Sequence, residues 1–243
     1  MKNICFIPAR GGSKGIKNKN ISLLDGLPLI YWSILAAAEC EIFDYIYVSS
    51  DSNLILDYVN IFNGKVGNSN IVKVIRSESC SGDRSTTESA VLEFLDNCSN
   101  ICDKDMIYIL QPTSPFRYND LIAEFDTDFK KSGKDSGFSV ELITPFLWKS
   151  ERPLYDISMR KMRQELCLND FYYHEDGNIY ACTVGHMRNK KIRLSENSYM
   201  HVSDEVQALQ IDSYLELNFL NLIAHENMEI AKWKTDIVSL LPR

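Results

Sequence analysis

ICFIPARGGSKGIKNKN, residues 4–20, is the stretch that organises the rest of the chain. It begins as an apolar run long enough for a buried strand, and it continues as a loop with paired glycines, a serine and several cations. Glycine permits positive φ and lets backbone N–H groups approach phosphate oxygens, which a Cβ would obstruct. Arg and Lys side chains neutralise phosphate charge; here they are Arg10, Lys14, Lys17 and Lys19. The stretch predicts a triphosphate or pyrophosphate cradle, with a flexible surface loop as the alternative.

The loop differs from two familiar phosphate-binding motifs. A P-loop ends in Gly-Lys followed by Ser or Thr, whereas Gly15 is followed by Ile16 and Lys17. The dinucleotide-binding fingerprint requires the spacing G-x-G-x-x-G, which Gly11, Gly12 and Gly15 do not have. The predicted phosphate site is therefore of another kind.

The composition favours a folded α/β protein that binds a small anion. Of the 243 residues, 45% are hydrophobic and 24% are charged, so we expect a substantial core. A net charge of −7 argues against binding nucleic acid or an anionic membrane, since both require a positive field. The seven cysteines are scattered, no signal peptide precedes them, and no apolar run approaches membrane-spanning length, which together predict reduced thiols in the cytoplasm.

Strands and helices are predicted to alternate through the first half of the chain. After the opening strand, we expect strands at residues 45–49, 72–75 and 106–110, and helices at residues 28–38, 54–62 and 87–95. Such alternation implies βαβ crossovers and a mostly parallel sheet. Polar clusters follow each strand, including Asp51, Arg76 and Gln111. Because ligands bind at the carboxyl ends of parallel strands, these clusters predict a cleft.

The second half departs from this rhythm. Residues 144–175 interleave aromatic residues with arginines, a composition typical of protein interfaces. We expect a turn at residues 176–178 leading into a strand at 179–183. A second strand at 208–211 would lead to Asp212 and put Gln210 on the same face as Asp212. A helix at 214–225, capped by Ser213 with Glu216 in a capping box, and an amphipathic tail would complete the chain.

IPARGGSKGIKNKNI, at residues 7–21, resembles the opening signature of the CMP-sugar-acid synthetases, the cytidylyltransferases that act on N-acylneuraminate and related nonulosonates. Further matching blocks extend to about Glu226, including QPTSPFR from Gln111 and RQEL from Arg163. The resemblance implies an α/β fold with a Rossmann-like, mostly parallel sheet of the nucleotidyltransferase (GT-A-like) type. Residues 1–143 and 176–243 would form this domain, and residues 144–175 a small excursion that dimerises and reaches the partner's sugar site.

The resemblance also assigns roles to individual residues. Catalytic roles fall to Arg10, Lys14, Gln111 and Asp212; nucleotide binding to Arg10, Gly11, Gly12, Ser13, Lys14, Lys19, Asn20, Arg76, Asp83 and Thr87; and sugar binding to Gln111, Arg163 and Tyr180. Helix capping is the alternative role for Asp83 and Thr87. Arg117, the last residue of the QPTSPFR motif, could be a surface cation without a role in the site. The family's I-D-I-D segment is here Leu209-Gln210-Ile211-Asp212, so Asp212 is the single carboxylate available to a Mg²⁺ ion.

These features together predict a cytoplasmic homodimer that uses CTP, a sugar acid and Mg²⁺. CMP would pass to the anomeric 2-hydroxyl of a nonulosonic acid and release pyrophosphate. The alternatives are a 3-deoxy-octulosonate cytidylyltransferase and a non-catalytic nucleotide-binding module. Gln210, which replaces an acidic residue, slightly favours the module.

Overall fold

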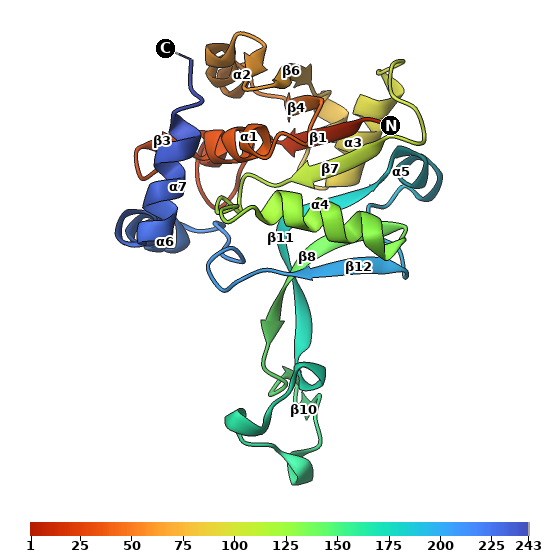
Figure 1. Cartoon of the computed structure of the whole chain (residues 1–243), viewed down its shortest axis with the longest axis vertical. Helices are drawn as coiled ribbons and strands as arrows, with labels where there is room; N and C mark the ends of the chain where they lie inside the picture. The colour runs from red at the N-terminus through yellow and green to blue at the C-terminus, as the bar shows by residue number, and fades with distance from the viewer. Residues whose placement is uncertain (243) are drawn as a thin grey trace.

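The opening stretch forms the strand β1 (Asn3–Pro8) near the middle of an eight-stranded sheet. This is a computed structural model, and it describes residues 1–242 (Figure 1). The strand order is β12-β8-β11-β7-β1-β4-β6-β5. The other strands are β4 (Tyr45–Ser50), β5 (Lys65–Val66), β6 (Ser69–Ile75), β7 (Met106–Leu110), β8 (Ser136–Ile143), β11 (Tyr172–Thr183) and β12 (Ser198–Val202). β7, β1, β4 and β6 run parallel to one another, and β11 lies antiparallel between β7 and β8.

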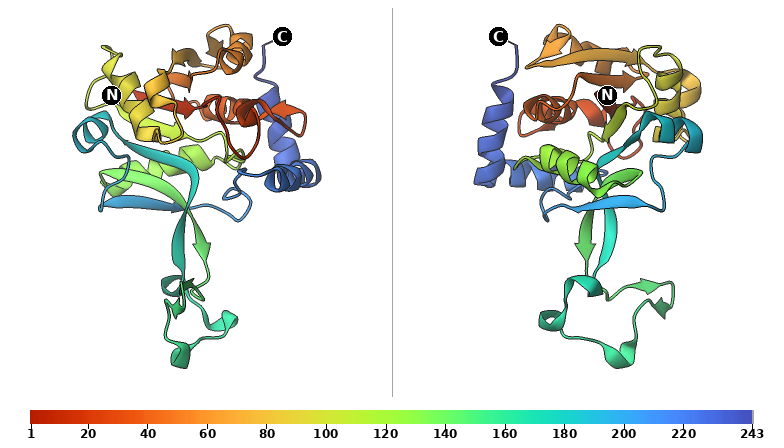
Figure 2. Two further views of the ribbon diagram at one scale, coloured as in Figure 1. Left: turned by 180° about the vertical axis from the view of Figure 1, so that it is seen from behind. Right: turned by 45° about the vertical axis from the view of Figure 1, so that its right-hand side comes forward.

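Helices cover both faces of the sheet (Figures 1 and 2). Alternate side chains of β1 enter two separate cores, with Cys5 and Ile7 in one and Ile4 and Phe6 in the other. The first core includes side chains from α1 (Leu29–Glu39), α2 (Asn53–Val59), α4 (Leu121–Ser132), α6 (Tyr214–Glu226) and α7 (Met228–Val238). The second core includes α3 (Thr87–Asp96) and α5 (Val184–Lys190). β1 is therefore buried on both faces, as a continuous apolar run predicts.

The predicted α/β fold is confirmed, and the expected strands and helices of the first half are all present. The capping box of α6 is also confirmed, because the Ser213 hydroxyl accepts from the Glu216 N–H and the Glu216 carboxylate accepts from the Ser213 N–H. None of the helices between residues 1 and 242 combines the length and hydrophobicity that crossing a bilayer requires.

The turn predicted at Asp176–Asn178 is wrong, because these residues belong to the long strand β11. The pairing of β11 with β8 shifts register between Glu175 and Tyr180, so the segment is an irregularity within the strand. Gly177 takes the positive φ, 69°, that this distortion needs. Asp176 is fully buried, and its carboxylate accepts from the hydroxyls of Ser139 and Ser203. Asp, Gly and Asn are common in turns, but here they form a bulge within a strand.

The strand predicted at Ala208–Ile211 is also wrong. The segment is irregular: Ala208 N–H donates to Asp204 O within a turn, and Ile211 N–H donates to Thr113 O at 2.8 Å. Contrary to the prediction from the sequence, Gln210 and Asp212 therefore do not share the face of a strand.

Residues 144–171 project from the sheet between β8 and β11 (Figure 1). The projection contains β9 (Trp148–Lys149), β10 (Arg152–Pro153) and three short 3-10 helices at Ile157–Met159, Arg163–Glu165 and Leu168–Asp170. Several of its large apolar side chains are exposed, namely Trp148, Leu154, Ile157, Met159, Met162 and Leu168. Its role in dimerisation stays a prediction.

The C-terminal helix α7 packs on α1 through Trp233. This indole is 6% exposed, lies 5.6 Å from the Trp32 ring and donates its N–H to Glu39. Lys234 adds an ion pair with Asp25. The tail is thus part of the first core.

We predict that Trp233→Ala lowers the free energy of unfolding by about 3–5 kcal/mol, the usual cost of removing a buried aromatic side chain. Urea denaturation measures this. Phe219→Ala, on the exposed face of α6, is the control and should change stability by about 0.5 kcal/mol or less. Similar small effects for both variants would contradict the packing of α7.

Candidate functional site

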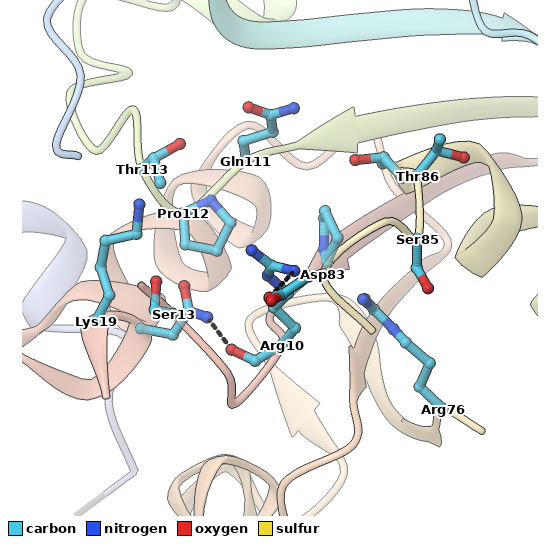
Figure 3. Close-up of a pocket in the computed structure, with 13 residues that line it drawn as sticks. Arg10, Ser13, Lys19, Arg76, Asp83, Ser85, Thr86, Gln111, Pro112 and Thr113 are labelled. Carbon is cyan, nitrogen blue, oxygen red and sulfur yellow. Dashed lines mark hydrogen bonds and ion pairs between the residues drawn. The ribbon is translucent and has the colours of Figure 1, made fainter. Parts of the chain in front are cut away.

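A polar cleft of about 300 Å³ lies at the carboxyl ends of the parallel strands (Figure 3). Its walls come from the loop after β1, the segment between β6 and α3, and the turn after β7. The lining residues are Pro8, Arg10, Ser13, Lys19, Asn20, Arg76, Asp83, Ser85, Thr86, Thr87, Gln111, Pro112 and Thr113. The cleft therefore lies where the polar clusters of the sequence predicted it.

Two of the three loop glycines, Gly11 and Gly15, are required by close approach rather than by unusual dihedral angles. Gly11, Gly12 and Gly15 do not have positive φ, so that part of the prediction is wrong. A Cβ on Gly11 would lie 2.8 Å from Ser52 Cβ, and a Cβ on Gly15 would lie 2.1 Å from the Asp212 carbonyl oxygen. Around Gly12, by contrast, a Cβ would meet nothing within 4 Å. Gly15 thus lets the loop pack directly on the backbone of Asp212.

Asp51 and Asn20 hold the first part of the loop. The Gly11 N–H donates to Asp51 Oδ1 at 2.8 Å, and the buried Asn20 side chain donates to Arg10 O at 2.9 Å. Asn20 therefore fixes the backbone of the loop at Arg10 and also lines the cleft. Asp51, which follows β4, was expected to lie near the cleft, but its hydrogen bond to the loop after β1 was not predicted.

Asp83 pairs with the loop cations. Its carboxylate lies 2.9 Å from Lys14 Nζ and 4.0 Å from Arg10 Nη1, while Arg10 also donates to Gly82 O. The hydrogen bond from Lys14 lowers the pKa of Asp83. Asp83 is not the cap of α3, because Thr86 takes that position. It supplies negative charge to the loop, and a phosphate chain bound there would compete with it for Lys14.

Lys19 joins the cleft to Asp212. Its ammonium donates to Asp212 Oδ1 at 2.9 Å and to Ile211 O at 3.0 Å. The Asp212 side chain remains 71% exposed, so it is open to solvent beside the loop. Glu216 fixes the backbone here, because its carboxylate accepts from the N–H groups of both Asp212 and Ser213 at 2.7 Å. These bonds lower the pKa of Glu216.

Asp212 offers one carboxylate to a cation. No group of three or more His, Cys, Asp or Glu side chains within residues 1–242 is arranged to hold a metal. A Mg²⁺ ion is commonly bound by one or two carboxylates together with substrate phosphates and water. The donor set fits Mg²⁺ only in that arrangement, with phosphate oxygens completing the shell.

Arg76 and the start of α3 form the wall away from Lys19 (Figure 3). Burial lowers the pKa of Arg76, and its guanidinium donates to the hydroxyl and carbonyl of Ser49. Thr86, rather than Thr87, caps α3 by accepting from the Ser89 N–H. Sequence reasoning missed Ser85 and Thr86 as lining residues, although the run Ser-Thr-Thr before a helix is a capping signal that could have indicated them.

Arg117 is a buried support rather than the surface cation considered from the sequence. It is 2% exposed and donates to Gln111 O, Asn178 O and Ser33 Oγ. Burial lowers its pKa to about 9. Through these bonds Arg117 joins the turn after β7 to the β11 bulge, and so holds Gln111 at the cleft.

Arg163 and Tyr180 do not line this cleft. Arg163 lies on the exposed projection. Tyr180 is buried beneath Arg193, whose guanidinium carbon is 4.1 Å from the ring centroid, and its hydroxyl donates to Glu175. Burial raises the pKa of Tyr180. Eight of the predicted residues line the cleft: Arg10, Ser13, Lys19, Asn20, Arg76, Asp83, Thr87 and Gln111. Gly11, Gly12, Lys14 and Asp212 belong to the same loop or contact it without lining the cleft, and Arg163 and Tyr180 lie outside it.

Comparisons with known proteins identify the family and the fold of the chain. A sequence profile of the family described as Cytidylyltransferase matches residues 4–174. The chain is 34% identical over 181 residues to N-acylneuraminate cytidylyltransferase A of Danio rerio, a match covering 69% of the chain and 40% of the relative. It is 29% identical over 236 residues to CMP-N,N'-diacetyllegionaminic acid synthase of Legionella pneumophila, covering 94% of the chain and 99% of the relative.

The chain spans half the length or less of the neuraminate relatives it matches, 40% for the Danio rerio protein and 50% for N-acylneuraminate cytidylyltransferase of Escherichia coli O18:K1:H7. A solved structure of CMP:2-keto-3-deoxy-manno-octonic acid synthetase complexed with CTP superposes with a TM-score of 0.66. That match covers 94% of this chain and 100% of the other, at 12% identity. It establishes the nucleotidyltransferase fold.

We predict that Gly15→Ala weakens binding of inorganic pyrophosphate by at least about tenfold and lowers stability by about 1–3 kcal/mol, because the new Cβ forces the loop off Asp212. Isothermal titration calorimetry and urea denaturation measure the two effects. Gly12→Ala is the matched control for stability, since its Cβ enters open space, and it should leave the free energy of unfolding unchanged. Equal stabilities of the two variants would contradict the close approach.

A second prediction concerns Glu216. Glu216→Gln should lower stability near neutral pH by about 0.5–2 kcal/mol, the usual contribution of a helix cap. Because folding depresses the pKa of Glu216, its stabilisation is present above the unfolded value of about 4.3 and is lost as pH falls through the lower folded value. Denaturation at several pH values should therefore show the difference between wild type and variant shrinking below about pH 4. A constant difference would rule out the charge of Glu216 as the cause.

Proposed function

Because the chain belongs to the cytidylyltransferase family, we propose that it transfers CMP from CTP to the anomeric 2-hydroxyl of a nonulosonic acid and releases pyrophosphate. The observation that carries this proposal is the contact between the loop after β1 and Asp212, made at Gly15 and Lys19. It puts a carboxylate beside a group of cations at the carboxyl ends of the strands, the arrangement that nucleotidyl transfer requires.

The loop cations supply most of the catalysis in this proposal. Arg10 and Lys14 bind the β- and γ-phosphates and neutralise the charge that develops on the leaving pyrophosphate. CTP binding releases Lys14 from Asp83, so a phosphate of the substrate replaces the Asp83 carboxylate as the partner of Lys14. Arg76, with Ser85 to Thr87, lies on the side of the cleft where base and ribose would bind.

Asp212 has the second role. It would hold a Mg²⁺ ion together with phosphate oxygens, and the ion when bound neutralises the α-phosphate and lowers the pKa of the attacking hydroxyl. Lys19, which contacts Asp212 and lines the cleft, would donate to a phosphate oxygen. Glu216 keeps the Asp212 backbone fixed while these partners change.

The acceptor in this proposal is a sialic-type acid rather than a 3-deoxy-octulosonate. Relatives named for neuraminate and diacetyllegionaminate support this, with matches of 34% and 29% identity. The octulosonate enzyme is similar at 12% identity, which supports the shared fold alone. A non-catalytic module is the second candidate, and Gln210 in place of an acidic residue is the observation that favours it.

We also propose a cytoplasmic homodimer. The exposed apolar side chains of residues 144–171 support dimerisation, because a second copy would cover them. In such a dimer Arg163 could reach the partner's cleft and bind the acceptor carboxylate. The seven cysteines are all unpaired, which suits a reducing compartment.

Pyrophosphate release from CTP tests the activity, with N-acetylneuraminate, N,N'-diacetyllegionaminate, pseudaminate and 3-deoxy-octulosonate as acceptors and with other NTPs in place of CTP. The proposal expects turnover with CTP and at least one of the three nonulosonic acids. Turnover with 3-deoxy-octulosonate alone would show that the chain is a 3-deoxy-octulosonate cytidylyltransferase, the alternative considered from the sequence. CTP binding without turnover on any acceptor would favour the module.

We predict that Asp212→Asn lowers kcat by at least about 100-fold, as loss of a charge that stabilises the transition state commonly does, and leaves the Kd for CTP within a few-fold of wild type. Asp236→Asn, an exposed carboxylate on α7, is the control and should keep full activity. Unchanged turnover by the Asp212 variant, measured against an active wild type, would contradict the metal assignment.

A further inference from the structure

Two glutamine side chains meet at Gly177 in the β11 bulge. A Cβ built on Gly177 would lie 3.0 Å from Gln210 Oε1 and 3.1 Å from Gln111 Oε1. Gln111 follows β7, and Gln210 belongs to the irregular segment before α6. Two distant parts of the chain therefore direct their amides to one spot beside the cleft: Gln111 is one of its lining residues, and Gln210 adjoins Gln111 at Gly177.

The backbone around these amides is firmly held. Arg117 donates to Gln111 O at 2.8 Å, and Ile211 N–H donates to Thr113 O at 2.8 Å, which ties the Gln210 segment to the turn after β7. The bulge itself is fixed by the buried Asp176 carboxylate, which also accepts from the Asn178 N–H. Gly177 leaves space for both amides, because a Cβ there would be in tight contact with the two amide oxygens.

The amides themselves are free to bind a ligand. Within residues 1–242 the hydrogen bonds of Gln111 use its backbone carbonyl, and the Gln210 side chain makes none. Both residues are partly exposed. Each amide offers two donors and an acceptor oxygen. The Gln111 and Gln210 side chains are neutral and together offer both donors and acceptors. The carboxylate of Asp212, two residues after Gln210, is paired with Lys19.

We propose that Gln210 is a specificity-determining residue that acts with Gln111 to bind neutral hydroxyl or N-acyl groups of the acceptor. This inference rests on the proposed function. A neutral amide at position 210, where the resembled segment has an aspartate, removes a potential cation ligand and adds a donor beside Gln111. Hydroxyl and acylamino groups need both donors and acceptors, which two carboxylates would not supply. The cation-facing role stays with Asp212 alone.

The test compares Gln210→Met, which keeps the side-chain length without the amide, with Gln210→Asp. Steady-state kinetics with N,N'-diacetyllegionaminate, pseudaminate and N-acetylneuraminate give the acceptor KM, and calorimetry gives the CTP Kd. We expect Gln210→Met to raise the acceptor KM by about tenfold or more, because a site built to hydrogen-bond its substrate loses affinity when one partner is removed, with the CTP Kd unchanged. Gln210→Asp should also raise the acceptor KM.

Asn218→Leu, which removes an exposed amide on α6, is the control and should behave as wild type. Two results would overturn the inference while leaving the proposed function intact: an unchanged acceptor KM in Gln210→Met, or a Gln210→Asp variant with higher kcat and half-maximal activity at lower Mg²⁺. The second would identify position 210 as a metal position that this chain has lost. Absence of wild-type turnover with all three acids would overturn both proposals.

Discussion

The close approach of Gly15 to the Asp212 carbonyl is the constraint on which the site depends. A side chain at position 15 would overlap Asp212 by more than ordinary contact allows, so the loop and the segment before α6 meet only because residue 15 is glycine. Lys19 completes the contact from the same loop. The loop after the opening strand and the segment before α6 are joined at this point, beside the polar cleft that the loop lines.

The site is supported mostly by residues outside its lining, and Asn20 is the one supporting residue that also lines the cleft. Asp51 and Asn20 hold the loop, Arg117 holds the turn after β7, and Glu216 holds Asp212. Asp83 is different, since it pairs with the cations directly, and in the proposed function it gives them up to the phosphates of CTP. A rigid frame with an exchangeable internal anion suits a reaction in which positioning and electrostatics supply most of the rate.

Local patterns predicted much of this architecture. The apolar run at Ile4–Ile7, the glycine and cation loop and the alternation of strands with helices led to the correct sheet and cleft. The errors lie where long-range contacts override local signals: Gly177 serves a bulge inside β11 instead of a turn, and the segment at Gln210 is irregular because its backbone bonds to the turn after β7. Burial of Arg117 was not predictable either, because its three acceptors come from separate elements.

A crystal structure of the complex with CTP would show where the triphosphate binds. We expect the β- and γ-phosphates to contact Arg10 and Lys14, Asp83 to be displaced from Lys14, and the α-phosphate to face Asp212. A triphosphate bound elsewhere in the molecule, with the Lys14 to Asp83 ion pair intact and Asp212 remote from phosphorus, would contradict this arrangement.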